Sequence, residues 1–253
     1  MRQLYFQQVQ ASVPDPKRSQ ALVALILDHA KKIIAHPARP RKQKIDSFVN
    51  QPQADLAIDE TLEENIVFDR PEELLVEYSE DRSFSCVMIL DTSSSMTGDK
   101  HLLASIAVAV LVLEVPAQDH ALVVFSSEAK AIKKLLVKEL PQATLLKFLS
   151  HQPRGFTNIA SGLQAGVNQL KQQGNRKKVG VIATDGRSTE GENPIEIAKH
   201  YDFLVVLHLC GAGSDLEASQ QIAQAGNGVC LEVEKLEDLP HRLYEALRML
   251  ARR

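Results

Sequence analysis

The sequence predicts a doubly wound α/β fold over the C-terminal two thirds of the chain. From about residue 83 of 253, apolar segments of strand length alternate with helix-like segments. Continuous apolar runs such as 84–90 (FSCVMIL) and 203–210 (FLVVLHLC) are typical of parallel strands covered on both faces. Because strands that alternate with helices form βαβ units, the pattern predicts a mainly parallel sheet of six strands with helices on both faces.

The individual elements follow from this alternation. We predict strands at 84–90, 120–127, 129–137, 177–186, 203–210 and 228–235. Helices are predicted between them, at 101–115, 144–152, 157–174, 193–201, 214–226 and 237–250. The segment 129–137 follows the second strand after too few residues for a crossover helix, so we expect a short antiparallel strand at the edge of the sheet.

The first part of the chain has a different composition. We assign residues 1–80 to an N-terminal extension and 81–253 to the α/β domain. Within the extension, a basic linker at 36–44 (HPARPRKQK) precedes an acidic stretch at 55–81. The linker could contact an acidic partner, but a solvated connector is the preferred interpretation.

An amphipathic helix is predicted at 16–34 of this extension. Its apolar stripe is formed by Leu22, Leu25, Ile26 and Ile33. Since such a stripe is costly to expose to water, we expect it to pack on the α/β domain. The alternative is a docking face for another protein.

Composition excludes several functional classes. A net charge of -3 argues against a surface built for nucleic acid. No apolar run is long enough to span a bilayer, and the opening residues lack the apolar core of a secretory signal. The three cysteines have no C-x-x-C spacing, which favours neither a disulfide framework nor a zinc site. A cytoplasmic protein is expected, with no nucleic-acid or membrane partner.

Small oxygen-bearing side chains gather where the predicted strands end. Asp91 closes the first strand and is followed by Ser93 and Ser95, whereas Thr157 precedes a helix and Asp185 closes a later strand. Ligands of open α/β sheets bind at the carboxyl ends of the strands, so these loops should converge. Hydroxyls with few carboxylates suit Mg²⁺, which retains bound waters, better than Ca²⁺.

These residues resemble a known metal site. The D-x-S-x-S sequence at Asp91, Ser93 and Ser95, followed by Thr157 in GFTN and Asp185 in TDG, is similar to the metal-ion-dependent adhesion site (MIDAS) of the von Willebrand factor A (vWA) domain family. The resemblance implies that the two serines bind the metal directly and Thr157 directly or through water. It implies that the two aspartates act mostly through bound waters. One metal position would stay open for a carboxylate of a protein partner. The cofactor expected is Mg²⁺, with Mn²⁺ as the alternative.

Other interpretations of the motif remain open. Asp91 to Ser95 could be a helix cap without metal, and Asp185 could be a turn residue. The sequence contains no G-x-x-x-x-G-K-[ST] loop and no G-x-S-x-G elbow. Ser93 occupies the position where haloacid-dehalogenase phosphatases need a second aspartate. We therefore expect a binding protein and not an enzyme, and a metal-dependent hydrolase is the weakest alternative.

The kind of vWA protein is also suggested by resemblance. A cytoplasmic chain with its vWA domain at the C-terminal end looks like the bacterial and archaeal proteins that work with MoxR-type AAA+ ATPases. This implies an adaptor in protein remodelling or metal insertion. Because one metal–carboxylate bond cannot hold two proteins together, we also expect polar contacts from the loops of Thr97, Arg154 and Arg187. The alternative is a stand-alone scaffolding or adhesion module without an ATPase partner. The sequence leaves the oligomeric state open.

Overall fold

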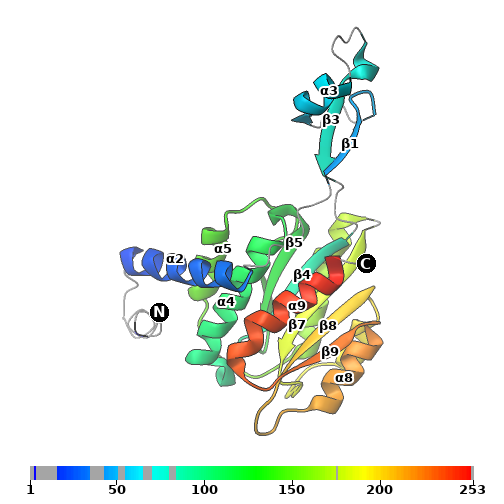
Figure 1. The fold of residues 1–253 in the computed structure, drawn as a ribbon. Coiled ribbons are helices and arrows are strands. Elements are labelled where there is room, and N and C mark those ends of the chain that lie inside the picture. The colour runs from blue at the N-terminus through cyan, green and yellow to red at the C-terminus, as the bar shows by residue number, and fades with distance from the viewer. Residues whose placement is uncertain are drawn as a thin grey trace. The chain divides into compact units, whose positions relative to one another are not determined.

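The computed structural model of the chain describes residues 3, 16–34, 43–50, 55–64, 70–79, 84–174 and 176–251 (Figure 1). Contacts within the chain divide it into two compact units. One unit comprises Met1–Ala35 together with Ser83–Arg253, and the other comprises His36–Arg82. Among the described helices, none is both long and apolar enough to cross a membrane.

A six-stranded sheet forms the centre of the larger unit. The strands are β4 (Phe84–Asp91), β5 (His120–Phe125), β6 (Ala129–Lys133), β7 (Lys177–Thr184), β8 (Phe203–Leu209) and β9 (Val229–Val233). They lie in the order β6-β5-β4-β7-β8-β9, and only β6 runs antiparallel to its neighbour. The predicted fold class and the antiparallel edge strand are confirmed. Strand order reverses between β4 and β7, which is where such sheets bind ligands.

Helices cover both faces of this sheet. The helices on one face are α2 (Pro16–Ile33), α4 (Asp99–Glu114), α5 (Pro141–Leu149) and α9 (Leu239–Ala251), and those on the other are α6 (Ile159–Leu170), α7 (Pro194–Ala198) and α8 (Leu216–Ala225). Successive residues of β4 enter the two cores alternately, with Met88 in one and Ile89 in the other. At Gly166 of α6, a Cβ atom would lie 2.3 Å from the Tyr201 hydroxyl, so glycine allows the helix to approach the sheet.

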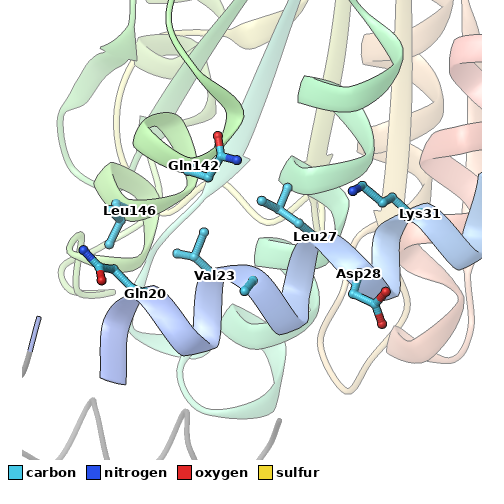
Figure 2. Close-up of a pocket in the computed structure, with 8 residues that line it drawn as sticks. Gln20, Val23, Leu27, Asp28, Lys31, Gln142 and Leu146 are labelled. Carbon is cyan, nitrogen blue, oxygen red and sulfur yellow. The ribbon is translucent and has the colours of Figure 1, made fainter. Parts of the chain in front are cut away.

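Helix α2 packs against α4 and α5 of the same unit, as expected from its amphipathic pattern (Figures 1 and 2). Leu22 and Ile26 are fully buried, but Leu25 is 39% exposed, so its place in the predicted stripe is wrong. The buried face consists of Leu22, Val23, Ile26, Leu27 and Ala30. Leu25 lies about 100° of helical rotation from Ile26 on the side opposite Leu27, and therefore falls outside this face. A groove of about 290 Å³ remains between α2 and α5.

The smaller unit contains strands that the sequence did not predict. It consists of β1 (Gln43–Ser47), β2 (Asp55–Leu56), α3 (Ile58–Glu64), the short 3-10 helix η1 (Pro71–Glu73) and β3 (Leu75–Ser79). The strands form an antiparallel sheet in the order β1-β3-β2. The Thr61 hydroxyl connects helix and sheet, because it donates to the Ala57 carbonyl (2.7 Å) and accepts from the Leu75 N–H (3.0 Å).

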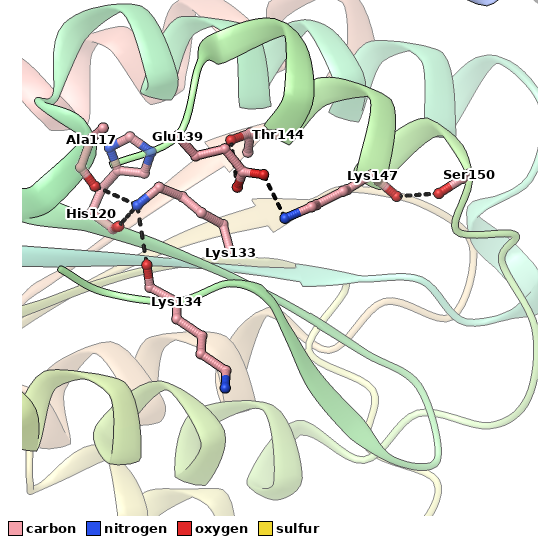
Figure 3. Close-up of polar contacts among 8 residues, drawn as sticks. All are labelled: Ala117, His120, Lys133, Lys134, Glu139, Thr144, Lys147 and Ser150. Atoms are coloured by element: carbon pink, nitrogen blue, oxygen red, sulfur yellow. Dashed lines mark hydrogen bonds and ion pairs between the residues drawn. The ribbon is translucent and has the colours of Figure 1, made fainter. Parts of the chain in front are cut away.

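A buried lysine fastens the edge strand β6 to the corner that precedes β5 (Figure 3). The Lys133 side chain is 1% exposed. Its ammonium group donates to the carbonyl oxygens of Ala117, His120 and Lys134. Burial lowers the pKa of Lys133 to about 8, against the attraction of Glu139. The three carbonyls replace water around the cation and give the group a structural role in the fold.

Candidate metal centre

The predicted site residues come together at the carboxyl edge of the sheet. Backbone hydrogen bonds join the loops that carry them. The Arg154 N–H donates to the Thr92 carbonyl (2.9 Å), and the Ser94 N–H donates to the Gly155 carbonyl (3.3 Å). The loop after β7 is attached in the same way, through the N–H of Thr189 and the carbonyl of Thr157 (2.9 Å). Three loops far apart in sequence therefore form one surface above β4 and β7.

Asp91 is the most constrained member of the group. Its side chain is 3% exposed, and its Oδ1 accepts the Ser93 N–H at 2.8 Å. The pKa of Asp91 is raised to about 6, mainly by burial and to a smaller extent by the nearby charge of Asp185, against the hydrogen bonds from Ser93 and the attraction of Lys100. The metal-free fold therefore holds a buried carboxylate whose charge is not fully compensated.

Two serine hydroxyls stand next to this carboxylate. The Oγ atoms of Ser93 and Ser95 lie 3.1 Å apart, the first buried and the second exposed. A helix-cap role for these residues is not supported by the geometry. Helix α4 begins after Gly98, and neither it nor the short 3-10 helix η2 (Ser94–Met96) has a side-chain cap. The two hydroxyls are therefore not engaged in capping a helix.

Thr157 and Asp185 complete the set. The Thr157 side chain is 8% exposed, and its hydroxyl makes no hydrogen bond with any other described residue. Asp185 accepts the Arg187 N–H through Oδ1 (3.0 Å), which is the predicted turn interaction, and its charge acts on Asp91. The turn role and a metal role are compatible, since a carboxylate has further lone pairs.

The donor set fits a hard divalent cation that keeps some of its waters. It offers hydroxyl and carboxylate oxygens and no imidazole or thiolate. Within the described part of the chain, no group of three or more histidine, cysteine, aspartate or glutamate side chains is placed to hold a metal. Such a composition suits Mg²⁺ or Mn²⁺ better than a closed structural zinc site, and neutral hydroxyl ligands leave positive charge on the ion where the carboxylates act through bound waters.

Sequence reasoning missed the residues that position these oxygens. The Thr189 hydroxyl accepts the Thr157 N–H at 2.9 Å. Beneath the site, His208 Nδ1 lies 2.8 Å from the Ser219 hydroxyl, and both residues are buried. A Cβ atom at Gly186 would come within 2.4 Å of that hydroxyl, so the turn after β7 rests directly on it. In the sequence, only the two hydroxyl-bearing residues at 188–189 could have indicated such a positioning role.

Fold and site together define a Rossmann-like α/β domain with an oxygen-lined centre at its switch point. The chain belongs to the von Willebrand factor type A domain family, whose model matches residues 86–245. Comparison with curated protein sequences finds no significant match.

Three solved structures illustrate the similarity. An aerotolerance-related membrane protein from Bacteroides fragilis is 19% identical with a TM-score of 0.53, over 66% of this chain and 99% of that one. Proximal thread matrix protein 1 from the mussel byssus, solved with a zinc-occupied MIDAS motif, is 20% identical with a TM-score of 0.57, over 68% of this chain and 48% of that one. The pilus adhesin SpaC from Lactobacillus rhamnosus GG is 17% identical with a TM-score of 0.52, over 68% of this chain and 30% of that one. These likenesses establish a common fold.

Proposed function

We propose that the chain is a metal-dependent protein-binding module. In this proposal Asp91, Ser93, Ser95, Thr157 and Asp185 hold a divalent cation, and a carboxylate of a protein partner completes its coordination. The observation that carries the proposal is the buried Asp91 carboxylate, whose charge is not fully compensated and which lies next to the paired hydroxyls of Ser93 and Ser95. A cation bound there would supply a Lewis-acidic position for the partner's oxygen.

The chain's own residues prepare this position. The Ser93 N–H fixes the orientation of the Asp91 carboxylate. Thr189 holds the backbone of Thr157 on both sides, through its hydroxyl and its N–H, so the Thr157 hydroxyl stays free for the ion. Because these contacts exist before the metal arrives, little ordering is required on binding.

We propose Mg²⁺ as the ion, with Mn²⁺ as the alternative. The oxygen donors and the low ligand charge support this choice. The zinc-occupied MIDAS motif of the mussel protein makes zinc a necessary comparison in any titration. Calorimetry with the three ions on the same sample would rank them, and a clear preference for zinc would contradict the Mg²⁺ assignment.

We propose a MoxR-type AAA+ ATPase as the protein partner and an adaptor role in protein remodelling or metal insertion. This follows from the resemblance described above and from the lack of a phosphate-binding loop in the sequence, which suggests that another subunit supplies energy. We accordingly propose a binding protein and not an enzyme. A stand-alone scaffolding or adhesion module is the second candidate, favoured by the likeness to a pilus adhesin. The cytoplasmic location remains a prediction.

The test is a pull-down of the cognate ATPase in Mg²⁺, in chelator, and with the double variant Ser93→Ala, Ser95→Ala. We expect capture in Mg²⁺ and loss of capture in the other two conditions. Ser94→Ala is the matched control, because the Ser94 hydroxyl bonds to the Gly155 carbonyl (3.1 Å) and the backbone contact between these loops remains. Chelator-sensitive binding of acidic proteins without the ATPase would favour the stand-alone module. Capture that survives both chelator and double substitution would refute a metal-bridged contact.

A further inference from the structure

A small cavity opens beside the candidate metal centre. It has a volume of about 120 Å³, and Ser95 and Asp185 of the centre form part of its wall. Buried side chains of Met96 and Leu209 contribute apolar surface, and Lys100 from the first turn of α4 lines it as well. The space exceeds that of a single water several-fold and suits a short side chain. A partner group bound at the metal would therefore have a second pocket immediately next to it.

The cavity is flanked by positive charge. Lys100 is partly exposed and forms no ion pair within the described part of the chain. Arg187 reaches the loop that follows β8, because a Cβ atom at Gly213 would lie 3.1 Å from its Nη1. Met96 and Leu209 give the cavity apolar surface beside the positive charges of Lys100 and Arg187, whereas the charge of Asp185 would be compensated by a cation bound at the centre. With the metal in place, an acidic side chain with an aliphatic stem therefore matches the cavity.

An exposed aromatic side chain lies on the other side of the candidate metal centre. Phe156 is 67% exposed, although its own N–H is fixed by the Ser127 hydroxyl at 3.2 Å. Ser127 follows β5, so this aromatic ring belongs to the β5 side of the sheet edge. The cavity extends from the loop after β4, with Ser95, Met96 and Lys100, past Asp185 to the loop after β8. Since the strand order is β5-β4-β7-β8, the centre at β4 and β7 lies between the two features.

We propose that this edge binds an extended acidic segment of a protein partner. The central carboxylate binds at the metal, a neighbouring acidic side chain pairs with Lys100 in the cavity, and an apolar side chain on the other flank packs on Phe156. The three interstrand steps from β5 to β8 span about 14 Å, which four or five extended residues cover. The inference rests on the proposed function and adds to it the chemistry of the partner.

A peptide library tests this arrangement with the full chain. The probe is an immobilised positional-scanning set of heptapeptides with a fixed central glutamate, presented in Mg²⁺ and in chelator. The protein should select a second acid on one side of the glutamate and a large apolar residue on the other. Lys100→Gln should reduce the preference for the second acid about fivefold and leave the preference for the apolar residue unchanged. Phe156→Ser should reduce the preference for the apolar residue about fivefold and leave the preference for the second acid unchanged.

Two variants serve as matched controls. Lys177→Gln removes an exposed lysine at the opposite end of β7, and Leu140→Ser removes a side chain that is 72% exposed in the loop before α5. Both should leave selection unchanged. Phe156→Ser and the two controls should keep the wild-type Mg²⁺ affinity in calorimetry, and Lys100→Gln should not weaken it, because the substitution removes a positive charge that acts on Asp91. If capture is chelator-sensitive but Lys100→Gln and Phe156→Ser select like wild type, this inference is overturned and the proposed function stands. If chelator leaves capture unchanged, the result refutes both the proposed function and this inference.

Discussion

Replacing Asp91 by asparagine should make the metal-free protein more stable while removing its metal site. The change keeps the size of the side chain and the oxygen that accepts the Ser93 N–H. It removes a charge that burial places in an unfavourable environment, as shown by the rise of the Asp91 pKa from 3.8 to about 6. The effect on stability and the effect on metal binding therefore have opposite signs.

The magnitude follows from proton linkage. Because the folded-state pKa of Asp91 lies above the unfolded value, the folded protein binds the extra proton between pH 3.8 and about 6. Stability falls as pH rises through this window, and the full cost is present above it. This corresponds to about 3 kcal/mol at pH 8 and about 1 kcal/mol at pH 4.5. Asp91→Asn should recover these amounts in the free energy of unfolding.

Urea denaturation followed by far-ultraviolet circular dichroism provides the assay, because the chain has no tryptophan. In chelator, the variant should have a higher free energy of unfolding than the wild type, and this difference should be smaller at pH 4.5 than at pH 8. Saturating Mg²⁺ should stabilise the wild type by about 2.7 kcal/mol at one hundred times its Kd and leave the variant unchanged. A variant less stable than wild type at pH 8 in chelator would refute the reasoning, since it would mean that the fold compensates the Asp91 charge.

Two further predictions concern the scaffold. Lys133→Met should remove a pH dependence of stability. The Lys133 pKa is about 8 in the folded state and 10.5 in the unfolded state, so the unfolded state binds more protons between these limits. The free energy of unfolding of the wild type should therefore rise by up to about 3 kcal/mol relative to the variant from pH 8 to 10.5. Parallel urea curves across that range would contradict it. Ile26→Ala should lower the free energy of unfolding by about 2–4 kcal/mol, whereas the half-exposed Leu25→Ala should cost under about 1 kcal/mol. Equal effects in the same assay would mean that α2 does not belong to the core.

The α/β unit could be predicted because its sequence pattern reflects its packing directly. Residues 84–90 are apolar without interruption since β4 contributes alternately to two cores. The smaller unit could not be predicted in this way. Its strand β2 has two residues and depends on pairing with β3, so its sequence carries no periodic signal. Leu25 shows the same limit within a helix, because the edge of an apolar stripe is decided by the neighbouring helices.

The candidate site could likewise be predicted from the sequence only in part. Asp91, Ser93 and Ser95 stand at a strand end within one short motif, so local sequence was enough to nominate them. The roles of Thr189 and Lys100 depend on loops brought together by the fold. Thr189 contacts Thr157 across 32 positions, and Lys100 meets Asp185 only through the cavity they share. No spacing rule could have indicated either contact.

The way in which the loops are joined explains how the site keeps its oxygens available. Main-chain groups connect each pair of neighbouring loops, from Arg154 to Thr92, from Ser94 to Gly155 and from Thr189 to Thr157. Backbone bonds are directional and compensate groups that would otherwise be buried without partners. The Thr157 hydroxyl is therefore not needed to hold the structure together, although the hydroxyls of Ser94 and Thr189 contribute to the loop contacts. The buried charge of Asp91 lowers the stability of the metal-free fold, and a bound cation would relieve this cost. A fold stable enough to bear that cost, with two cores packed on one sheet, can thus maintain a site that is complete before its metal and its partner arrive.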